Sequence, residues 1–295
     1  MKIKLKKHFV RFNVLVISAV LLLLMLILLL GQRSEVTLSR WLITGVISIV
    51  VVYIASNVIA KRAIAPIEES WQNQLDFTSS ASHELRTPLA VIKTSLEIIM
   101  DNPEESVESQ MRWLENIYAE TERMSRLTED LLWLSRSDEH KLKLDKKEFQ
   151  LNDQVRQVVS QYSLVAKQKK INIKLIDTDV IQINAIESQM KQLLLILLDN
   201  AVKYTKENGN VTLSLAENNH SVVILVKDTG IGIPEDELVH VFERFYRVDK
   251  ARNSEIEGSG LGLAIAKDIV SNHNGTIEIQ SKETIGTEIV VTIPK

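Results

Sequence analysis

Two long apolar runs dominate the first sixty residues. The first, at 14–30, is 17 residues long, and the second, at 41–60, is 20 residues long. Because a membrane-spanning helix needs roughly 17–25 apolar residues, the pattern predicts two transmembrane helices at about 12–31 and 41–60. A cleaved signal peptide is the alternative for the first run. That run is long for a signal peptide, however, and no small-residue cleavage site precedes Gln32.

Helical periodicity resumes after the second run. Pro66 marks a kink or a fresh start, so residues 63–76 are predicted as a linker, with helices from about 67. Two helical patterns follow at 67–100 and at about 105–137, separated by Asp101-Asn102-Pro103. Two helices joined by a short turn form an antiparallel hairpin, which buries too little surface alone. Residues 77–142 are therefore predicted to be a dimerisation domain, an all-α hairpin that completes a four-helix bundle in a homodimer.

The pattern changes again after about residue 146. Apolar and polar residues alternate at 171–175, 211–215, 222–226, 276–280 and 288–293, which predicts strands. Helical stretches lie between them at about 153–168, 187–204 and 260–273. Residues 146–295 are therefore predicted to form an α+β domain.

Charge is distributed unevenly along the 295 residues, whose net charge is −3. Residues 1–62 hold nine Lys or Arg and one acid, and the remainder holds 26 bases and 37 acids. The acidic part argues against direct nucleic-acid binding, whereas the basic end fits a membrane surface made of lipid. Lys and Arg are concentrated before the first run and after the second run, and positive charge is typical of the cytoplasmic side. We therefore predict a multi-pass protein of the cell membrane, anchored by residues 1–62, with both termini cytoplasmic. The chain has no Cys, which excludes a disulfide scaffold, a thiolate zinc site and a Cys nucleophile.

The first hairpin helix carries candidate catalytic residues, in the segment Ser82-His83-Glu84-Leu85-Arg86-Thr87-Pro88. Thr87 is four residues after His83 and shares its helix face. Glu84 is an adjacent carboxylate able to hold one imidazole nitrogen protonated and leave the other nucleophilic. A lone surface histidine is the plain alternative, but a proline inside a helix costs about 3 kcal/mol and calls for a reason.

Several downstream motifs suit a nucleotide. Asn200 and Lys203 share a helix face, where an amide oxygen suits Mg²⁺ and an ammonium suits phosphate. Seen alone, they equally fit a polar helix C-terminus. Asp228-Thr229-Gly230-Ile231-Gly232 follows a strand, and Gly258-Ser259-Gly260-Leu261-Gly262 opens a helix, where free N–H groups suit phosphate. Between these two motifs, Phe242–Arg247 is an aromatic and basic cluster, and residues 248–257 are predicted to be a lid.

In this order, the motifs resemble the sensor histidine kinases of two-component systems over about residues 67–295. His83–Pro88 is similar to the H box, Asn200–Tyr204 to the N box, Asp228–Gly232 to the G1 box, Phe242–Phe245 to the F box and Gly258–Gly262 to the G2 box. The resemblance implies that residues 146–295 form a Bergerat-type ATP-binding sandwich. It also implies ATP and Mg²⁺ as cofactors, and a cytoplasmic response regulator as the partner that receives the phosphoryl group on an Asp.

The resemblance also implies roles for individual residues. His83 is the expected phosphoacceptor, Glu84 orients its ring and accepts its proton, and Thr87 orients water if the regulator is also dephosphorylated. Asn200 is expected to hold Mg²⁺ and Asp228 to recognise the adenine amine. The remaining expected contacts to ATP are Lys203 and Arg247 at the phosphates, Tyr204, Gly230, Gly232, Gly258, Gly260 and Gly262 around the pocket and its lid, and Thr287 at the pocket floor.

Two departures from the family pattern qualify these expectations. Ile196 stands where relatives usually carry Asn, which puts the Mg²⁺–phosphate shell in doubt and argues against simple ATP hydrolysis. Only 22 residues separate Ala60 from His83, too few for a HAMP relay, and the predicted outer loop at 32–40 has nine residues. The chain therefore resembles the intramembrane-sensing kinases, which take their signal through membrane helices or another membrane protein. A non-enzymatic receptor with a degenerate nucleotide domain and a fold-related ATPase are the competing functions.

Overall fold

The computed structural model describes residues 15, 17–19, 21–22, 26, 38–138, 146–176, 179–218, 220–248 and 258–295. The first apolar run, the loop at 32–40 and the lid segment at 248–257 lie largely outside the described residues. The chain divides into two compact units, Met1–Ser79 and Ser80–Lys295, and each is considered by itself.

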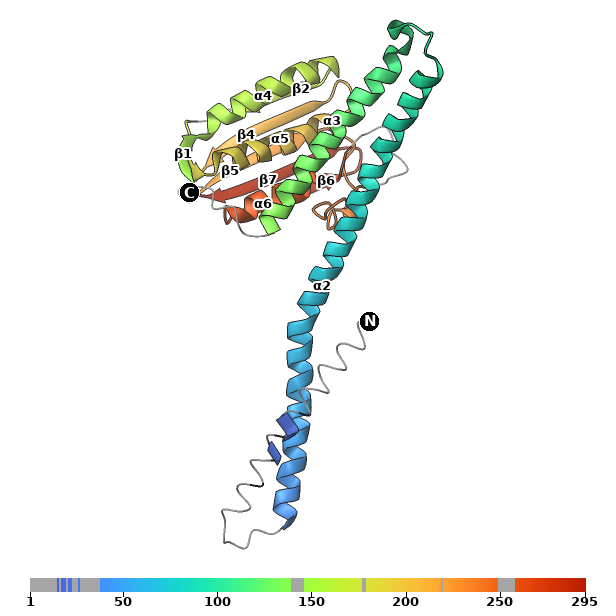
Figure 1. The fold of residues 1–295 in the computed structure, drawn as a ribbon. Helices are drawn as coiled ribbons and strands as arrows, with labels where there is room; N and C mark the ends of the chain where they lie inside the picture. The colour runs from blue at the N-terminus through green and yellow to red at the C-terminus, as the bar shows by residue number, and fades with distance from the viewer. Residues whose placement is uncertain are drawn as a thin grey trace. The chain divides into compact units, whose positions relative to one another are not determined.

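Helix α2 runs without interruption from Leu38 to Asp101 (Figure 1). It includes residues 63–76, so the predicted linker is helical and Pro66 does not start a new helix. A proline removes one backbone donor, and the hydrogen bonds on either side keep a long helix continuous. Within the described part of the chain, no helix meets the length and apolarity that crossing a bilayer requires. The two membrane spans therefore stay predictions.

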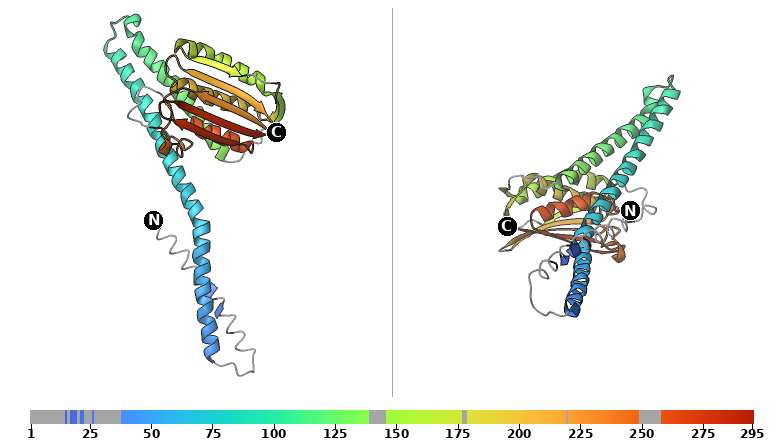
Figure 2. Two further views of the ribbon diagram at one scale, coloured as in Figure 1. Left: turned by 180° about the vertical axis from the view of Figure 1, so that it is seen from behind. Right: turned by 60° about the horizontal axis from the view of Figure 1, so that its bottom comes forward.

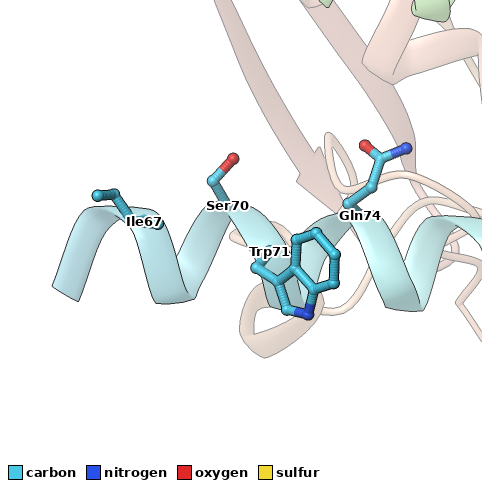
Figure 3. Close-up of a pocket in the computed structure, with 4 residues that line it drawn as sticks. All are labelled: Ile67, Ser70, Trp71 and Gln74. Carbon is cyan, nitrogen blue, oxygen red and sulfur yellow. The ribbon is translucent and has the colours of Figure 1, made fainter. Parts of the chain in front are cut away.

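The part of α2 that belongs to the first unit carries a shallow hollow of about 400 Å³. Ile67, Ser70, Trp71 and Gln74 line it, at successive turns of the helix (Figure 3). Ile67 and Trp71 are 68% and 64% exposed. None of these four residues belongs to the predicted site.

In the second unit, the end of α2 and helix α3 (Val107–Asp138) form the predicted hairpin. The first helix ends at Asp101, as Asp101-Asn102-Pro103 predicts. The turn is fixed by Asn102, whose Nδ2 donates to the Ile98 carbonyl at 2.8 Å, and by Gln110, whose Nε2 donates to the Asn102 carbonyl at 2.7 Å. Large apolar side chains stay exposed along both helices, as expected for a hairpin that a second copy covers; they include Leu89, Leu96, Met100, Met111, Leu114 and Tyr118.

The C-terminal part is built from seven strands and three α-helices among the described residues. In chain order they are β1 (Lys147–Gln150), α4 (Leu151–Gln168), β2 (Asn172–Ile176), β3 (Gln182–Ala185), α5 (Glu187–Tyr204), β4 (Asn210–Glu217), β5 (Ser221–Asp228), the 3₁₀ turn η1 (Glu235–Glu237), α6 (Gly262–Asn272), β6 (Thr276–Lys282) and β7 (Gly286–Pro294). The main sheet has the order β2-β4-β5-β7-β6, in which only the β2–β4 pair is parallel.

Helices α4, α5 and α6 cover one face of this sheet, and the strands come to the front in the view from behind (Figures 1 and 2). The core lies between these two layers. In α5 it includes Leu193, Leu194, Leu197 and Leu198, and in β4 and β5 it includes Val211, Leu213, Val222 and Ile224, all fully buried. Every second strand residue points inward, which is why alternation in the sequence predicts these strands.

The predicted α+β domain is confirmed in its five main strands and three helices. The short strands β1 and β3, which pair antiparallel as a separate sheet, were not predicted. Each has four residues, too few for alternation to distinguish a strand from a loop.

A buried histidine joins the end of α6 to the start of α5. His273 donates from Nδ1 to the Ile269 carbonyl at 2.8 Å, and its Nε2 accepts the Ile186 N–H at 3.0 Å. This pattern requires the neutral ring, and burial lowers the pKa of His273 below its usual value. The two helices that frame the site are thereby held at a fixed spacing.

Candidate functional site

The predicted phosphoacceptor lies on the exposed surface of α2. His83 and Thr87 are both exposed one turn apart, and Pro88 is buried. The Thr87 hydroxyl donates to the His83 carbonyl at 3.4 Å, so its lone pairs stay directed away from the helix. The imidazole is therefore accessible to a reactant.

Glu84 is held between the two helices of the hairpin. Its Oε2 lies 3.7 Å from Nη2 of Arg123 on α3, and Nη1 of the same guanidinium lies 3.6 Å from Oε2 of Glu120. All three side chains are about one-fifth exposed. Arg123 was not predicted from the sequence, because its pairing with Glu84 depends on the register of α2 against α3.

The C-terminal turns of α5 carry Asn200, Lys203 and Tyr204, each half-buried. The Lys203 ammonium lies 5.7 Å from the centre of the Tyr204 ring. Burial raises the pKa of Tyr204, and the positive charge of Arg247 opposes that rise, which places Arg247 near the ring. Two cations and an amide thus gather at this helix end.

Asp228 lies at the end of β5, next to these residues. Its Oδ1 accepts the Gly230 N–H at 2.8 Å and the Thr287 N–H at 3.2 Å. Burial raises the pKa of Asp228, and the two N–H donors oppose that rise. Because both donors use the same oxygen, Oδ2 remains to accept a hydrogen bond from a ligand. The Ile231 N–H donates to the Tyr204 carbonyl at 3.1 Å, which joins this loop to α5.

The hairpin between β6 and β7 closes the site beside Asp228. Thr287 pairs in register with Ser281, and their hydroxyl oxygens are 2.8 Å apart. Gly286 lies against the Asp228 backbone, and Gly232 lies against the backbone of Lys282. The pocket floor predicted at Thr287 therefore adjoins the predicted adenine-binding carboxylate.

The second glycine motif contacts both α5 and the aromatic segment. A methyl group placed on Gly258 would lie 2.6 Å from Nζ of Lys203, and one on Gly262 would lie 3.3 Å from Cγ2 of Ile196. The Gly260 carbonyl accepts the Phe245 N–H at 3.0 Å. The structure thus brings together all four nucleotide motifs, with Ile196 one turn before Asn200.

This group of side chains fits a nucleotide. Asp228 presents an acceptor for a base amine, and Lys203 and Arg247 bring positive charge for phosphates. Among the described residues, no group of three or more His, Asp or Glu side chains could hold a metal by itself. A Mg²⁺ ion held by Asn200 would therefore need phosphate oxygens and water to complete its shell.

A carboxylate from α3 also reaches the second glycine motif. Asp130 accepts a hydrogen bond from the Ser259 hydroxyl, and its pKa is raised to about 6, mainly by burial and then by Glu129. Asp130 was not predicted, because its partner Ser259 lies far along the chain and no local pattern joins the two. Its contact ties α3 to the loop that opens α6.

Two family models match the chain in the order that the motifs predict. Residues 73–140 match the His Kinase A (phospho-acceptor) domain, and residues 185–295 match the histidine kinase-, DNA gyrase B- and HSP90-like ATPase family. The chain belongs to the two-component sensor histidine kinases. The family resemblance of the motifs is thereby confirmed.

Curated relatives extend the match across both domains of this histidine kinase chain. It is 39% identical over 237 residues to the sensor histidine kinase WalK of Bacillus subtilis (strain 168), covering 77% of this chain and 38% of the relative. It is 35% identical over 240 residues to the sensor protein CiaH of Streptococcus pneumoniae serotype 4, covering 81% of this chain and 54% of the relative. The chain thus spans about half or less of the length of these relatives.

Solved structures of histidine kinases share the fold. The histidine kinase AdeS of Acinetobacter baumannii is 26% identical with a TM-score of 0.58, covering 72% of this chain and 97% of that one. The histidine kinase ThkA in complex with the response regulator protein TrrA has a TM-score of 0.61 at 24% identity, covering 80% of this chain and 65% of that one. The second comparison shows the fold alone.

Proposed function

We propose that this chain is an ATP-dependent protein-histidine kinase that phosphorylates His83 and passes the phosphoryl group to an Asp of a response regulator. The observation that carries the proposal is the assembly of Asp228, Lys203 and Asn200 in one site, on the same chain as an exposed His83 beside Glu84. Phosphoryl transfer depends on positioning and charge neutralisation more than on covalent chemistry by the protein. These residues provide both.

Each residue has a defined task in this reaction. The imidazole nitrogen of His83 attacks the γ-phosphorus, the bond from that phosphorus to the β–γ bridging oxygen breaks, and ADP leaves. Glu84 takes the ring proton, and its pairing with Arg123 keeps the carboxylate in place on the hairpin. Lys203 and Arg247 neutralise phosphate charge. Asn200 would hold Mg²⁺, which when bound would supply further positive charge at the phosphates.

Ile196 favours this transfer over simple hydrolysis of ATP. Its apolar side chain contacts the start of α6 one turn before Asn200, where fold-related ATPases place a carboxylate that activates water. This branched hydrocarbon side chain neither binds nor deprotonates water. The γ-phosphate therefore has no water-activating group at this position of α5.

Replacing His83 with Gln is expected to abolish phosphorylation of the protein. The measurement is incorporation of label from [γ-³²P]ATP into the full-length chain, followed by acid and alkali treatment. The label should be lost in acid and kept in alkali, because a phosphoramidate on nitrogen has this stability and a phosphoserine does not.

The matched control is His220→Gln, the same change at an exposed histidine in the β4–β5 connection, which should keep full labelling. Release of phosphate without protein label would favour the ATPase. Binding of ATP with neither product would favour the non-enzymatic receptor. Acid-stable label, or label that persists in His83→Gln, would refute His83 as the acceptor.

We also propose that the N-terminal segment anchors the chain in the cell membrane with both termini in the cytoplasm. Two apolar runs flanked by Lys and Arg support this topology. In the second run, large apolar side chains are about half exposed, as a lipid or membrane-protein contact needs; they are Val46, Ile47, Ile49, Val50, Val51 and Ile54. Signal input through these helices, directly or from another membrane protein, follows from the short outer loop.

Because the chain has no Cys, single cysteines report topology directly. A cysteine at Ser34 in intact cells is expected to react with a membrane-impermeant maleimide. One at Ser79, exposed on α2, should react only after the cells are opened. Equal labelling of both sites in intact cells would contradict the proposed topology.

A further inference from the structure

Arg123 lies between two carboxylates of the hairpin, although the proposed reaction uses only one of them. Its Nη2 is 3.7 Å from Oε2 of Glu84 on α2, and its Nη1 is 3.6 Å from Oε2 of Glu120, one turn earlier on α3. Both are ion-pair distances, but they exceed the roughly 2.7–2.9 Å of a charge-assisted hydrogen bond. The guanidinium is therefore shared between the two carboxylates and makes a close bidentate contact with neither.

Glu120 depends on this guanidinium more than Glu84 does. The Glu120 side chain is 17% exposed, against 23% for Glu84, and its Oε2 is buried. No hydrogen-bond donor among the described residues reaches that oxygen, so the positive charge of Arg123 is what balances it. A carboxylate oxygen that is shielded from water and lacks a donor is costly, and a nearby cation reduces that cost. Arg123 is thus drawn toward Glu120 as well as toward Glu84.

This sharing matters because Glu84 has to accept a proton in the proposed reaction. The nitrogen of His83 bonds to the γ-phosphorus, the bond from that phosphorus to the β–γ bridging oxygen breaks, ADP leaves, and the ring proton passes to Glu84. A carboxylate in close bidentate contact with a guanidinium has both oxygens engaged and accepts a proton less readily. The looser contact with Arg123 holds Glu84 on the hairpin and leaves it able to accept.

We propose that Glu120 is a positioning residue for the phosphorylation of His83, and that it acts by drawing Arg123 away from close contact with Glu84. The inference rests on the proposed function, because it concerns the proton acceptor of the same reaction. Glu120 acts only through Arg123 and takes no proton from the imidazole. It lies on the other helix of the hairpin, outside the segment that carries His83.

Replacing Glu120 with Gln keeps the size of the side chain and removes its charge. Arg123 is then attracted by Glu84 alone and closes on it. The rate of labelling of His83 in the full-length chain at saturating [γ-³²P]ATP is expected to fall about fivefold. A fivefold change corresponds to about 1 kcal/mol, the size of a salt bridge near the protein surface. The ATP concentration that gives half the maximal rate should not change, because Glu120 belongs to none of the nucleotide motifs.

The matched control is Glu97→Gln, which removes a carboxylate that pairs with Lys93 at 3.5 Å on the same hairpin and should keep the wild-type rate. Glu120→Asp keeps the charge but moves it back by one methylene group, so its rate should lie between those of wild type and Glu120→Gln. This variant keeps the inference testable if Glu120→Gln does not fold. A wild-type rate in Glu120→Asp and Glu120→Gln would overturn the inference.

A double substitution separates this role from a structural one. In a chain that already carries Arg123→Gln, adding Glu120→Gln should leave the rate unchanged, because no guanidinium remains to close on Glu84. Loss of a merely structural contact would slow labelling equally in both backgrounds, and that result would overturn the inference while leaving the proposed function standing. A wild-type chain that gains no label on His83 would refute both.

Discussion

Replacing Asp228 with Ala is expected to weaken ADP binding by at least about 100-fold, because a hydrogen bond to a charged group contributes about 1.5–3 kcal/mol and unpaired N–H groups add to the loss. The substitution removes the acceptor proposed for the adenine amine. It also leaves the N–H groups of Gly230 and Thr287 without their carboxylate oxygen. Calorimetric titration of the full-length chain with ADP measures the effect.

Asp228→Asn separates recognition from loop structure. The amide oxygen still accepts from Gly230 and Thr287, but the other position becomes an NH₂ group that opposes the adenine amine. Affinity is therefore expected to fall even though the loop is preserved. Wild-type affinity in Asp228→Asn would contradict the assignment of this residue to adenine.

The same carboxylate predicts a pH dependence. Burial raises the pKa of Asp228, so the carboxylate becomes protonated at a higher pH than an ordinary aspartate does. A protonated carboxyl loses an acceptor, and ADP affinity is therefore expected to decline as the pH is lowered toward that pKa. The decline should be absent in Asp228→Asn, which does not titrate.

The sequence predicts the helices and long strands of this chain because their periodicity extends over many residues. Prediction from the sequence fails where an element has few residues or where its structure depends on residues distant in the chain. The four-residue strands β1 and β3 are stabilised by each other across 31 intervening residues, and alternation within either is too brief to detect. Continuity of α2 through Pro66 likewise depends on helix on both sides, which a local rule about proline does not consider.

The site shows the same division. Motif order predicts its glycines, Asn200 and Asp228, because the family resemblance assigns these residues to the ligand. Asp130 is missed because its partner Ser259 lies far along the chain, and Ser281 is missed because its contact with Thr287 depends on how β6 pairs with β7. A serine in the alternating strand β6 matches an ordinary outward-facing position. Only the register between β6 and β7 reveals that Ser281 faces Thr287.

Gly286 is the position where a single methyl group is expected to damage both the fold and the site. Its φ angle is +139°, a conformation that residues with a side chain rarely adopt, and a Cβ atom there would collide with the Asp228 carbonyl oxygen. Gly286→Ala is expected to destabilise the α/β part by about 2–4 kcal/mol, from backbone strain together with displacement of β7 from β5. ADP affinity should fall as well, since Thr287 moves with the strand.

Hydrogen exchange of the β5 and β7 amides measures this loss without requiring the whole chain to unfold in one step. A loss of 2–4 kcal/mol corresponds to roughly 30- to 1,000-fold faster exchange where these amides exchange through opening of this part. The matched control is Gly262→Ala at the first residue of α6, where the nearest atom is a side-chain methyl group at 3.3 Å and alanine favours the helix. Protection should be retained there. Equal protection in both variants would show that the close approach of β7 to Asp228 does not determine the stability of this sheet.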